Sequence, residues 1–344
     1  MKVLLFVSAF TLVGTCAHKR HSEKIEDVKN QIQFKQESKV EEFANTITSD
    51  ELKELVYELS SDENKGRKTG EFGHNRACDY IKNFYIKHEV ASPLGGDNYY
   101  QNIPKSFLNG DLKSSQNVVA YIKGSEFPEE VLVISAHSDH LGITDMLVNP
   151  GADDNASGTS AIMEIAEAFK LAEQQGIGPK RSILFLHLTS EEEGLYGSRY
   201  YIEHPVFGLN NTIANLNIDM IGRVDNSHKD NSNYIYLIGS DRISTELHFI
   251  SEKANNDFIH LDLDYTYNAD NDPNRYYYRS DHYNFAQKNI PVIFYFNGEH
   301  DDYHLPTDTA DKINYPLLAK RTKLIFTTAW YIVNSDKRLS PEKV

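Results

Sequence analysis

A strand, a helix and a second strand in succession constrain the fold of this 344-residue chain more than any other feature. Residues 131–136 are almost entirely apolar, as expected of a strand that is buried on both faces. Residues 159–172 place apolar side chains at helical spacing, and residues 183–188 form another apolar run. A crossover of this length favours parallel pairing of the two strands. The sequence therefore predicts an α/β fold.

The remaining elements extend this pattern into a larger sheet. Further strands are predicted at residues 117–124, 212–221, 234–238 and 290–296, and helices at residues 48–59, 75–88, 244–255 and 315–334. The first of these helices begins with a capping box, in which Glu51 follows Thr48 by three residues. Residues 262–272 are rich in Asp, Asn and Tyr and predict a surface loop. The expected architecture is a three-layer α/β/α sandwich with a central mixed, mostly parallel sheet.

Composition narrows the class of protein. With 40% hydrophobic residues, the chain can bury one large core, and we expect one main domain. The formal net charge of -15 and the lack of a long basic run argue against a nucleic-acid partner. Only two cysteines are present, Cys16 and Cys78, which excludes a disulfide framework. We expect a monomer.

The first 17 residues are typical of an export signal. Lys2 precedes an apolar run that is too short to span a bilayer as a mature helix, and small residues favour cleavage after Ala17. A lipoprotein signal with Cys16 as the lipidated residue is the alternative. No second membrane segment follows, so we expect a periplasmic or extracellular protein. The expected division is a signal peptide at 1–17, a charged segment at 18–43, the main domain at 44–336 and a tail at 337–344.

Two adjacent aspartates, Asp153 and Asp154, lie between glycines directly before the helix at residues 159–172. Their like charges repel each other, and Asp disfavours helix interiors. Taken alone, this stretch could be a solvated loop in which Ser157 or Asn155 caps the helix. The alternative is that a cation lies beside the two carboxylates.

Further metal-binding residue types follow the neighbouring predicted strands. The candidate ligands are His137, Asp153, Glu192, Asp219 and His304. Three carboxylates and one bridging hydroxide balance the charge of two zinc ions, and the imidazoles add neutral donors. Cobalt or manganese could substitute. Asp139 lies two residues after His137, so it is expected to face the same side and to orient that histidine.

Each of these residues could also be purely structural. His137 with Asp139 could be a surface pair, Glu191 to Glu193 a solvated charge run, and His304 a polar residue in an acidic turn. Asp219 fits a structural role least, because an unpaired carboxylate in an apolar strand is costly. Together they favour a metal site at the carboxyl ends of the strands.

Five segments contain the candidate ligands. They are His137-Ser138-Asp139-His140-Leu141-Gly142, Gly151-Ala152-Asp153-Asp154-Asn155-Ala156-Ser157-Gly158, Glu191-Glu192-Glu193-Gly194-Leu195-Tyr196-Gly197-Ser198, Asn217-Ile218-Asp219-Met220 and Tyr303-His304-Leu305-Pro306-Thr307-Asp308. These segments resemble the motifs of one family, the co-catalytic dizinc exopeptidases of the bacterial leucyl aminopeptidase type. Glutamate carboxypeptidases, glutaminyl cyclases and the transferrin receptor ectodomain are relatives. The similarity runs from about residue 48 to about residue 334.

The resemblance implies a role for each candidate. Asp153 would bridge two zinc ions, with His137 and Asp219 completing one site and Glu192 and His304 the other. Glu191 would be the general base, and a cis peptide would follow Asp153. A tyrosine that stabilises the reaction intermediate would be Tyr277, although Tyr276 and Tyr278 flank it.

The implied activity is removal of N-terminal residues from peptides with a free amino end, by attack of a metal-activated water. Carboxypeptidase or dipeptidase action is the first alternative, but no basic residue can be assigned from the sequence to a terminal carboxylate. Glutaminyl cyclisation and a metal-free binding protein are two further alternatives. The presence of all five candidate ligands argues against both.

Overall fold

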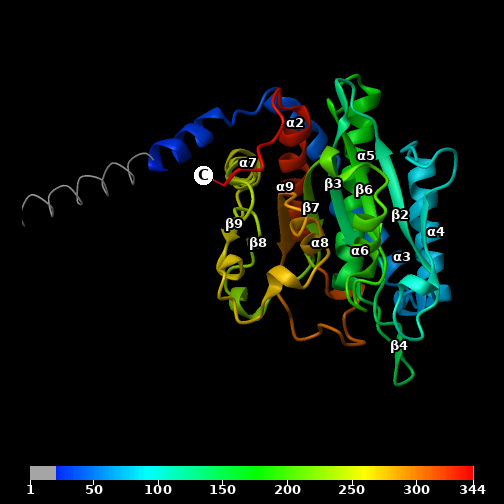
Figure 1. Ribbon diagram of the computed structural model, residues 1–344. Coiled ribbons are helices and arrows are strands. Elements are labelled where there is room, and N and C mark those ends of the chain that lie inside the picture. The colour runs from blue at the N-terminus through cyan, green and yellow to red at the C-terminus, as the bar shows by residue number, and fades with distance from the viewer. Residues whose placement is uncertain (1–20, 344) are drawn as a thin grey trace, which may run out of the picture.

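An eight-stranded sheet forms the centre of the computed structural model, which describes residues 21–343 (Figure 1). The predicted export signal and Cys16 lie outside the described residues. The strand order is β1-β2-β6-β3-β7-β10-β8-β9. The strands are β1 (Tyr100–Ile103), β2 (Ser115–Ile122), β3 (Phe127–His137), β6 (Arg181–Leu188), β7 (Thr212–Ile218), β8 (Tyr234–Ile238), β9 (Asp262–Asp264) and β10 (Val292–Phe296). The four strands β6, β3, β7 and β10 run parallel to one another, which confirms the mostly parallel sheet.

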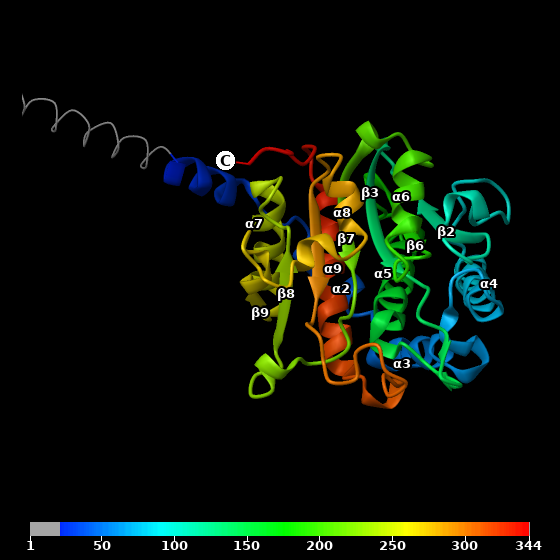
Figure 2. The ribbon, with the colours of Figure 1, turned by 60° about the horizontal axis from the view of Figure 1, so that its bottom comes forward.

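Helices cover both faces of the sheet (Figure 2). One face carries α3 (Ser49–Leu59), α4 (Phe72–Lys87), α5 (Gly158–Gln174), α7 (Thr245–Ala254) and α9 (Tyr315–Asn334), with α2 (Glu37–Ala44) packed against α5 and α9. The other face carries α6 (Tyr196–Glu203) and α8 (His282–Ala286). The expected three-layer α/β/α sandwich is therefore confirmed.

Alternation along β3 shows why its sequence is apolar throughout. Leu132 and Ile134 pack into the core under α5 and α9, whereas Val131 and Val133 pack into the core beneath α6 and α8. All four side chains are fully buried. Successive side chains point to opposite faces of a strand, so a strand between two helical layers needs apolar residues at every position.

The segment before the predicted domain also belongs to the core. Residues 21–31 are helical, and the side chains of Ile32, Val40 and Phe43 are buried in the main core. The ring of Phe43 stacks on Trp330 of α9 at a centroid distance of 5.7 Å. We therefore propose that the folded unit begins near residue 32, earlier than the expected boundary at residue 44.

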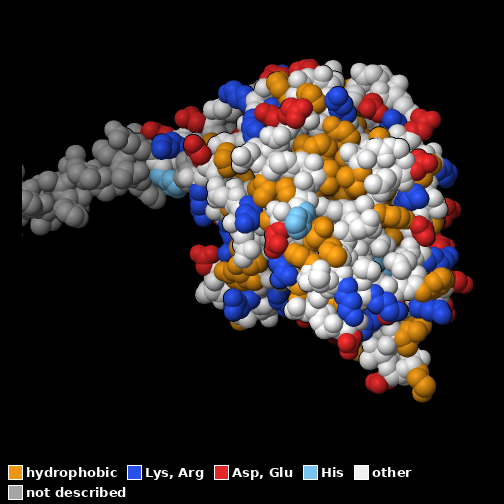
Figure 3. Space-filling view, turned by 45° about the vertical axis from the view of Figure 1, so that its right-hand side comes forward, with side chains coloured by type: hydrophobic (Ala, Val, Ile, Leu, Met, Phe, Trp, Pro, Cys, Tyr) orange, Lys and Arg blue, Asp and Glu red, His pale blue; other side chains and the backbone are white. Residues whose placement is uncertain are grey.

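Two features of the surface differ from a plain α/β sandwich. The loop predicted at residues 262–272 begins with the short strand β9, which pairs in parallel with β8 and forms one edge of the sheet. A hairpin of β4 (Ile143–Thr144) and β5 (Leu147–Val148) projects from the molecule, and its apolar tip is visible at the bottom of Figure 3. Within residues 21–343, no helix is both long enough and apolar enough to cross a membrane.

Glu164 is a buried acidic residue in the helical layer. Its side chain lies on α5, and the residue is only 3% exposed. Burial raises the pKa of the Glu164 carboxyl to about 9, and the negative charges of Glu51 and Glu167 add to this effect. The folded protein therefore holds a proton at Glu164 that the unfolded chain releases at a much lower pH.

We predict that Glu164→Gln stabilises the protein increasingly as the pH rises. The folded pKa of Glu164 lies above its unfolded value of 4.5. Glu164 therefore does not lower the free energy of unfolding below pH 4.5, and it lowers that free energy progressively as the pH rises to about 9. The Tm of the variant, measured by calorimetry, should exceed that of the parent by at least about 2 °C at pH 8.5 and by less at pH 5.5. Glu129→Gln, at an exposed glutamate, is the control. An equal shift at both pH values would contradict this account.

Candidate active site

The candidate residues lie at or after the carboxyl ends of the parallel strands, at one edge of the sheet. His137 is the last residue of β3, Asp219 directly follows β7, and Glu191 follows β6 after two intervening residues. His304 lies in the loop after β10. Because β3, β6, β7 and β10 are parallel, their carboxyl ends meet at the same edge, where binding sites of open α/β sheets lie.

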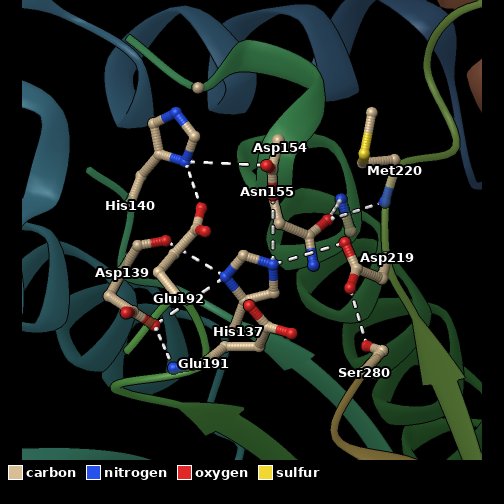
Figure 4. A network of polar contacts seen from close by, with 12 residues as sticks. His137, Asp139, His140, Asp154, Asn155, Glu191, Glu192, Asp219, Met220 and Ser280 are labelled. Atoms are coloured by element: carbon tan, nitrogen blue, oxygen red, sulfur yellow. Dashed lines mark hydrogen bonds and ion pairs between the residues drawn. The ribbon is translucent and has the colours of Figure 1, made fainter. Parts of the chain in front are cut away.

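One group of candidate metal-binding atoms is centred on His137 (Figure 4). Its Nε2 lies 3.2 Å from Oδ1 of Asp154 and 3.3 Å from Oδ1 of Asp219. Ser280 donates a hydrogen bond of 2.6 Å to the other oxygen of Asp219, which holds that carboxylate in place. His137 and Asp154 are fully buried, and Asp219 is nearly so. One imidazole and two carboxylates therefore face one another with little access to water.

A second group shares the same aspartate. Nε2 of His304 lies 3.1 Å from Oδ2 of Asp154 and 3.2 Å from Oε2 of Glu192. This ring nitrogen forms no hydrogen bond with any described residue. Asp154 thus contributes one oxygen to each group.

These separations fit zinc. Zinc binds nitrogen and oxygen at about 2.0–2.2 Å, so two donors of one tetrahedral ion lie about 3.3 Å apart. All four separations in the two groups fall between 3.1 and 3.3 Å. Two imidazoles and three carboxylates are also ligand types that zinc accepts. The donor set therefore fits two ions that share Asp154.

The expected ligand Asp153 is not part of either group. Its carboxylate accepts hydrogen bonds from the Gly222 amide at 2.7 Å and from Asn297 at 3.0 Å, and it lies 3.2 Å from Nε2 of His300. The cis peptide joins Asp154 to Asn155, one residue later than expected. The structure thus places Asp154, rather than the expected Asp153, between His137 and His304, and we propose Asp154 as the residue shared by the two groups.

The backbone explains this register. Asp308 accepts hydrogen bonds from the amides of both Asp153 and Asp154, and Gly151 begins the turn in the left-handed region at φ 56°. The turn points Asp153 towards Asn297 and Asp154 towards the two histidines. Two adjacent aspartates have the same chemistry, so this difference is set by the fold.

Asp139 lies beside His137, but its backbone carbonyl is closer to the imidazole than its carboxylate is. Nδ1 of His137 lies 3.1 Å from the Asp139 carbonyl oxygen and 3.7 Å from its carboxylate. That carboxylate accepts hydrogen bonds from Thr69 at 3.0 Å and from the Glu191 amide at 3.2 Å. Asp139 thus connects the ring of His137 with the start of the loop that carries Glu191.

Glu191 stands beside the metal-binding atoms, within the cluster that contains His137 and Glu192. Burial raises the pKa of the Glu191 carboxyl well above its usual range, and the charges of Asp219 and Glu192 add to the rise. Burial acts in the same direction on Asp154, but contacts with His137, His140 and His304 outweigh it and hold the pKa of Asp154 well below its usual range. Neighbouring carboxylates at one site thus differ strongly in their affinity for a proton.

A buried arginine, Arg67, lies next to this acidic cluster and binds the backbone of the segment that carries it. Arg67 donates hydrogen bonds to the carbonyl oxygens of Ser138 at 3.0 Å, Pro150 at 2.7 Å and Gly151 at 2.8 Å. Burial lowers the pKa of the Arg67 guanidinium to about 10, so the group remains charged at neutral pH. Its charge is attracted to Asp154. Arg67 therefore fixes both ends of the segment between His137 and Asp154.

A pocket of about 400 Å³ opens beside the metal-binding atoms. It is lined by Asp154, Glu191, Glu192, Gly194, Leu195, Asp219, Met220, Tyr276, Tyr278, Arg279, Phe294, Phe296, Glu299, Tyr303 and His304. Met220, Phe294 and Phe296 are buried apolar residues of this lining. Arg279 and Glu299 form an ion pair of 3.0 Å among partly exposed residues.

Tyr277 does not line this pocket. Its ring packs under the guanidinium of Arg242, 3.9 Å from the ring centre, and against His282. Tyr276 and Tyr278 line the pocket instead. The choice of Tyr277 among the three consecutive tyrosines is therefore not supported, because the short helical turn at Tyr276–Tyr278 directs the middle side chain away.

Three residues near the site were not predicted from the sequence: His140, Arg67 and Arg279. His140 lies in the same segment as His137, and its position three residues after a candidate ligand could have drawn attention to it. Arg67 and Arg279 carried no comparable signal, because Arg67 contacts carbonyl oxygens more than 70 residues away and Arg279 pairs with Glu299 of another loop.

Comparison with known proteins gives the family. Residues 117–329 match Peptidase family M28. The chain belongs to this family. That membership confirms the resemblance inferred from the five motifs, and the matched residues include all five side chains of the two metal-binding groups.

Curated relatives of this M28 chain include a protein named "Probable zinc metalloprotease" from Pyricularia oryzae, 29% identical over 264 residues, which are 65% of this chain and 51% of the relative. "Aminopeptidase YwaD" from Bacillus subtilis is 25% identical over 242 residues, covering 68% of this chain and 48% of the relative. The chain thus spans about half the length of these curated relatives.

Solved structures show the same fold. The Legionella pneumophila LapA aminopeptidase aligns with a TM-score of 0.69 and 22% identity, covering 89% of this chain and 77% of that one. Porphyromonas gingivalis glutaminyl cyclase aligns with a TM-score of 0.63 and 18% identity, covering 82% and 97%. These likenesses show that the chain shares its fold with both proteins.

The two adjacent aspartates give a direct test of the metal-binding groups. We predict that Asp154→Asn lowers the zinc retained after dialysis to well under half of the parent value, since Asp154 belongs to both groups. Asp153→Asn should keep the parent zinc content and lower only the Tm, because Asp153 contacts Asn297 and the Gly222 amide. Metal analysis by mass spectrometry measures both. Loss of zinc in Asp153→Asn with retention in Asp154→Asn would restore the assignment made from the sequence.

Proposed function

We propose that this chain is an exported, zinc-dependent aminopeptidase that holds two metal ions. His137, Asp154 and Asp219 would hold one ion, and His304, Asp154 and Glu192 the other. The observation that carries the proposal is that two donor groups share Asp154 beside both Glu191 and a pocket. Peptides with a free N-terminus are the proposed substrates.

Zinc in these groups would polarise the scissile carbonyl and lower the pKa of a bound water. Glu191, whose carboxylate lies within 4.8 Å of donor atoms of His137 and Glu192, would take a proton from the attacking water. The same carboxyl then returns that proton to the departing amine, as a general acid. Met220, Phe294 and Phe296 would receive the side chain of the N-terminal residue, because they are buried apolar residues of the pocket lining.

Carboxypeptidase or dipeptidase action remains the second candidate, because Arg279 supplies a basic group at the pocket that the sequence alone did not identify. A guanidinium of this kind could bind a terminal carboxylate. Glu299 already pairs with Arg279 at 3.0 Å, however, so its charge is balanced before any substrate arrives. That pairing favours the aminopeptidase.

Two further functions fit the site less well. A glutaminyl cyclase of this family would need one zinc, whereas five side chains here form two complete groups. A metal-free binding protein would leave these carboxylates buried with Arg67 as the cation that offsets their charge, and burial of further uncompensated carboxylates is costly. Export is proposed from residues 1–17 alone, with lipidation at Cys16 as the alternative.

One peptide in three forms tests the reaction class. We expect the free peptide and its C-terminal amide to be cleaved at similar rates, and the N-acetylated form at least about 100-fold more slowly, since an aminopeptidase must bind a free amine. Chelator treatment should stop cleavage, and added zinc should restore it. Chromatography with mass detection follows the products. Cleavage of the acetylated form but not the amide would favour a carboxypeptidase, and activity that survives complete metal removal would exclude the zinc mechanism.

Glu191→Gln separates catalysis from metal binding. We predict an unchanged zinc content and a fall in kcat of about 10²–10⁴-fold, the range typical of lost general acid–base catalysis. Glu193→Gln is the matched control, because Glu193 is exposed and does not line the pocket. Near-parental turnover in Glu191→Gln, or the loss appearing in Glu193→Gln instead, would show that the base is assigned to the wrong residue.

A further inference from the structure

His140 is a buried histidine at the second metal-binding group that has no role so far. It follows β3, and its amide donates a hydrogen bond of 3.1 Å to the Arg67 carbonyl oxygen. Nδ1 of its ring lies 2.6 Å from Oε1 of Glu192 and 3.8 Å from Oδ2 of Asp154 (Figure 4). Gly151 packs against the ring, where a side chain would collide with it. The ring is therefore fixed by its surroundings.

His140 could either bind the metal or position a residue that does, and the distances separate these roles. His140, Asp154 and Glu192 together form a potential metal-binding cluster. Two donors 2.6 Å apart would subtend an angle of only about 80° at a zinc ion with bonds of about 2.0–2.1 Å, against about 109° for a tetrahedral ion. The pairs formed by His304 lie at 3.1 and 3.2 Å. Only the latter match two ligands of one ion.

The separation of 2.6 Å instead matches a short hydrogen bond from an N–H group to a carboxylate. We propose that His140 is a positioning residue for Glu192, whose Oε1 accepts a hydrogen bond from the His140 Nδ1–H group. The second carboxylate oxygen, Oε2, is thereby left facing His304. This inference rests on the proposed two-metal site and adds to it the residue that selects which oxygen of Glu192 reaches the metal.

The hydrogen bond from His140 stabilises the Glu192 carboxylate, which lies beside a second carboxylate, that of Asp154. Like charges on Asp154 and Glu192 repel each other, and both side chains are only 5% exposed, so water screens them poorly. An N–H group on Oε1 offsets part of this repulsion and prevents rotation of the carboxylate. Residues that orient a ligand in this way typically change metal affinity by about 10–100-fold when they are lost.

The test is the zinc affinity of two substitutions at His140 in the full chain. His140→Ala removes the donor, whereas His140→Asn retains an N–H group in place of Nδ1. Zinc-loaded protein is titrated with a competing chelator, and the dissociation constants of both equivalents are fitted. We expect His140→Ala to weaken one equivalent by about 10–100-fold and to leave the other unchanged. His140→Asn should stay within about threefold of the parent.

Three results would overturn the proposal. Parental affinity of both equivalents in His140→Ala would show that the hydrogen bond is unimportant. Equal weakening in His140→Asn and His140→Ala, with a changed visible absorption spectrum of the cobalt-substituted protein, would identify His140 as a ligand. His204 is exposed and serves as the control position. If His204→Ala weakened the same zinc equivalent by the same factor as His140→Ala, the effect would be unspecific. A parent that binds fewer than two zinc ions would instead refute the proposed two-metal site itself.

Discussion

The confinement of several carboxylates at one edge of the sheet is the constraint on which the rest of this structure depends. Oxygens of Asp154, Asp219 and Glu192 lie between 3.1 and 3.3 Å from Nε2 of His137 or His304, in surroundings that exclude most water. Such a cluster repels itself unless cations compensate it. The chain supplies a permanent cation, Arg67, and two sets of donors spaced for divalent ions.

The α/β architecture makes this confinement possible because it brings rigid elements to one place. Four parallel strands end at the same edge, and each of them is paired with a neighbouring strand on both sides, so the segments that carry the site start from rigid backbone. The loops that follow these strands are also fixed by hydrogen bonds. Arg67 donates to the carbonyl oxygens at both ends of the segment from Ser138 to Gly151. Asp308 accepts hydrogen bonds from the amides of Asp153 and Asp154. The network beyond the ligands thus determines their positions as much as the ligands themselves do.

Much of this could be predicted from residues alone. Successive side chains of β3 are buried on opposite faces of the sheet, so the strand requires an apolar run, and that run is visible in the sequence. The capping box at Thr48 is likewise local, and its hydrogen bond to the Glu51 amide is present at 3.2 Å. His137, Glu192, Asp219 and His304 could be chosen because ionisable residues that follow apolar strands are costly to bury unless a partner compensates them. The position of β9 and the packing of Phe43 on Trp330 could not be predicted, because both depend on contacts between distant segments.

The sequence by itself determined the layer order, the strand ends that carry the site, and the residue types that bind a divalent metal, since periodicity and residue chemistry are local properties. Only the tertiary structure decided that Asp154 faces the histidines while Asp153 faces Asn297, that Tyr276 and Tyr278 line the pocket in place of Tyr277, and that His140 contacts Glu192. Neighbouring residues of the same type are chemically equivalent in a sequence. The direction in which the backbone turns, set by partners such as Asp308 far along the chain, is what makes them different.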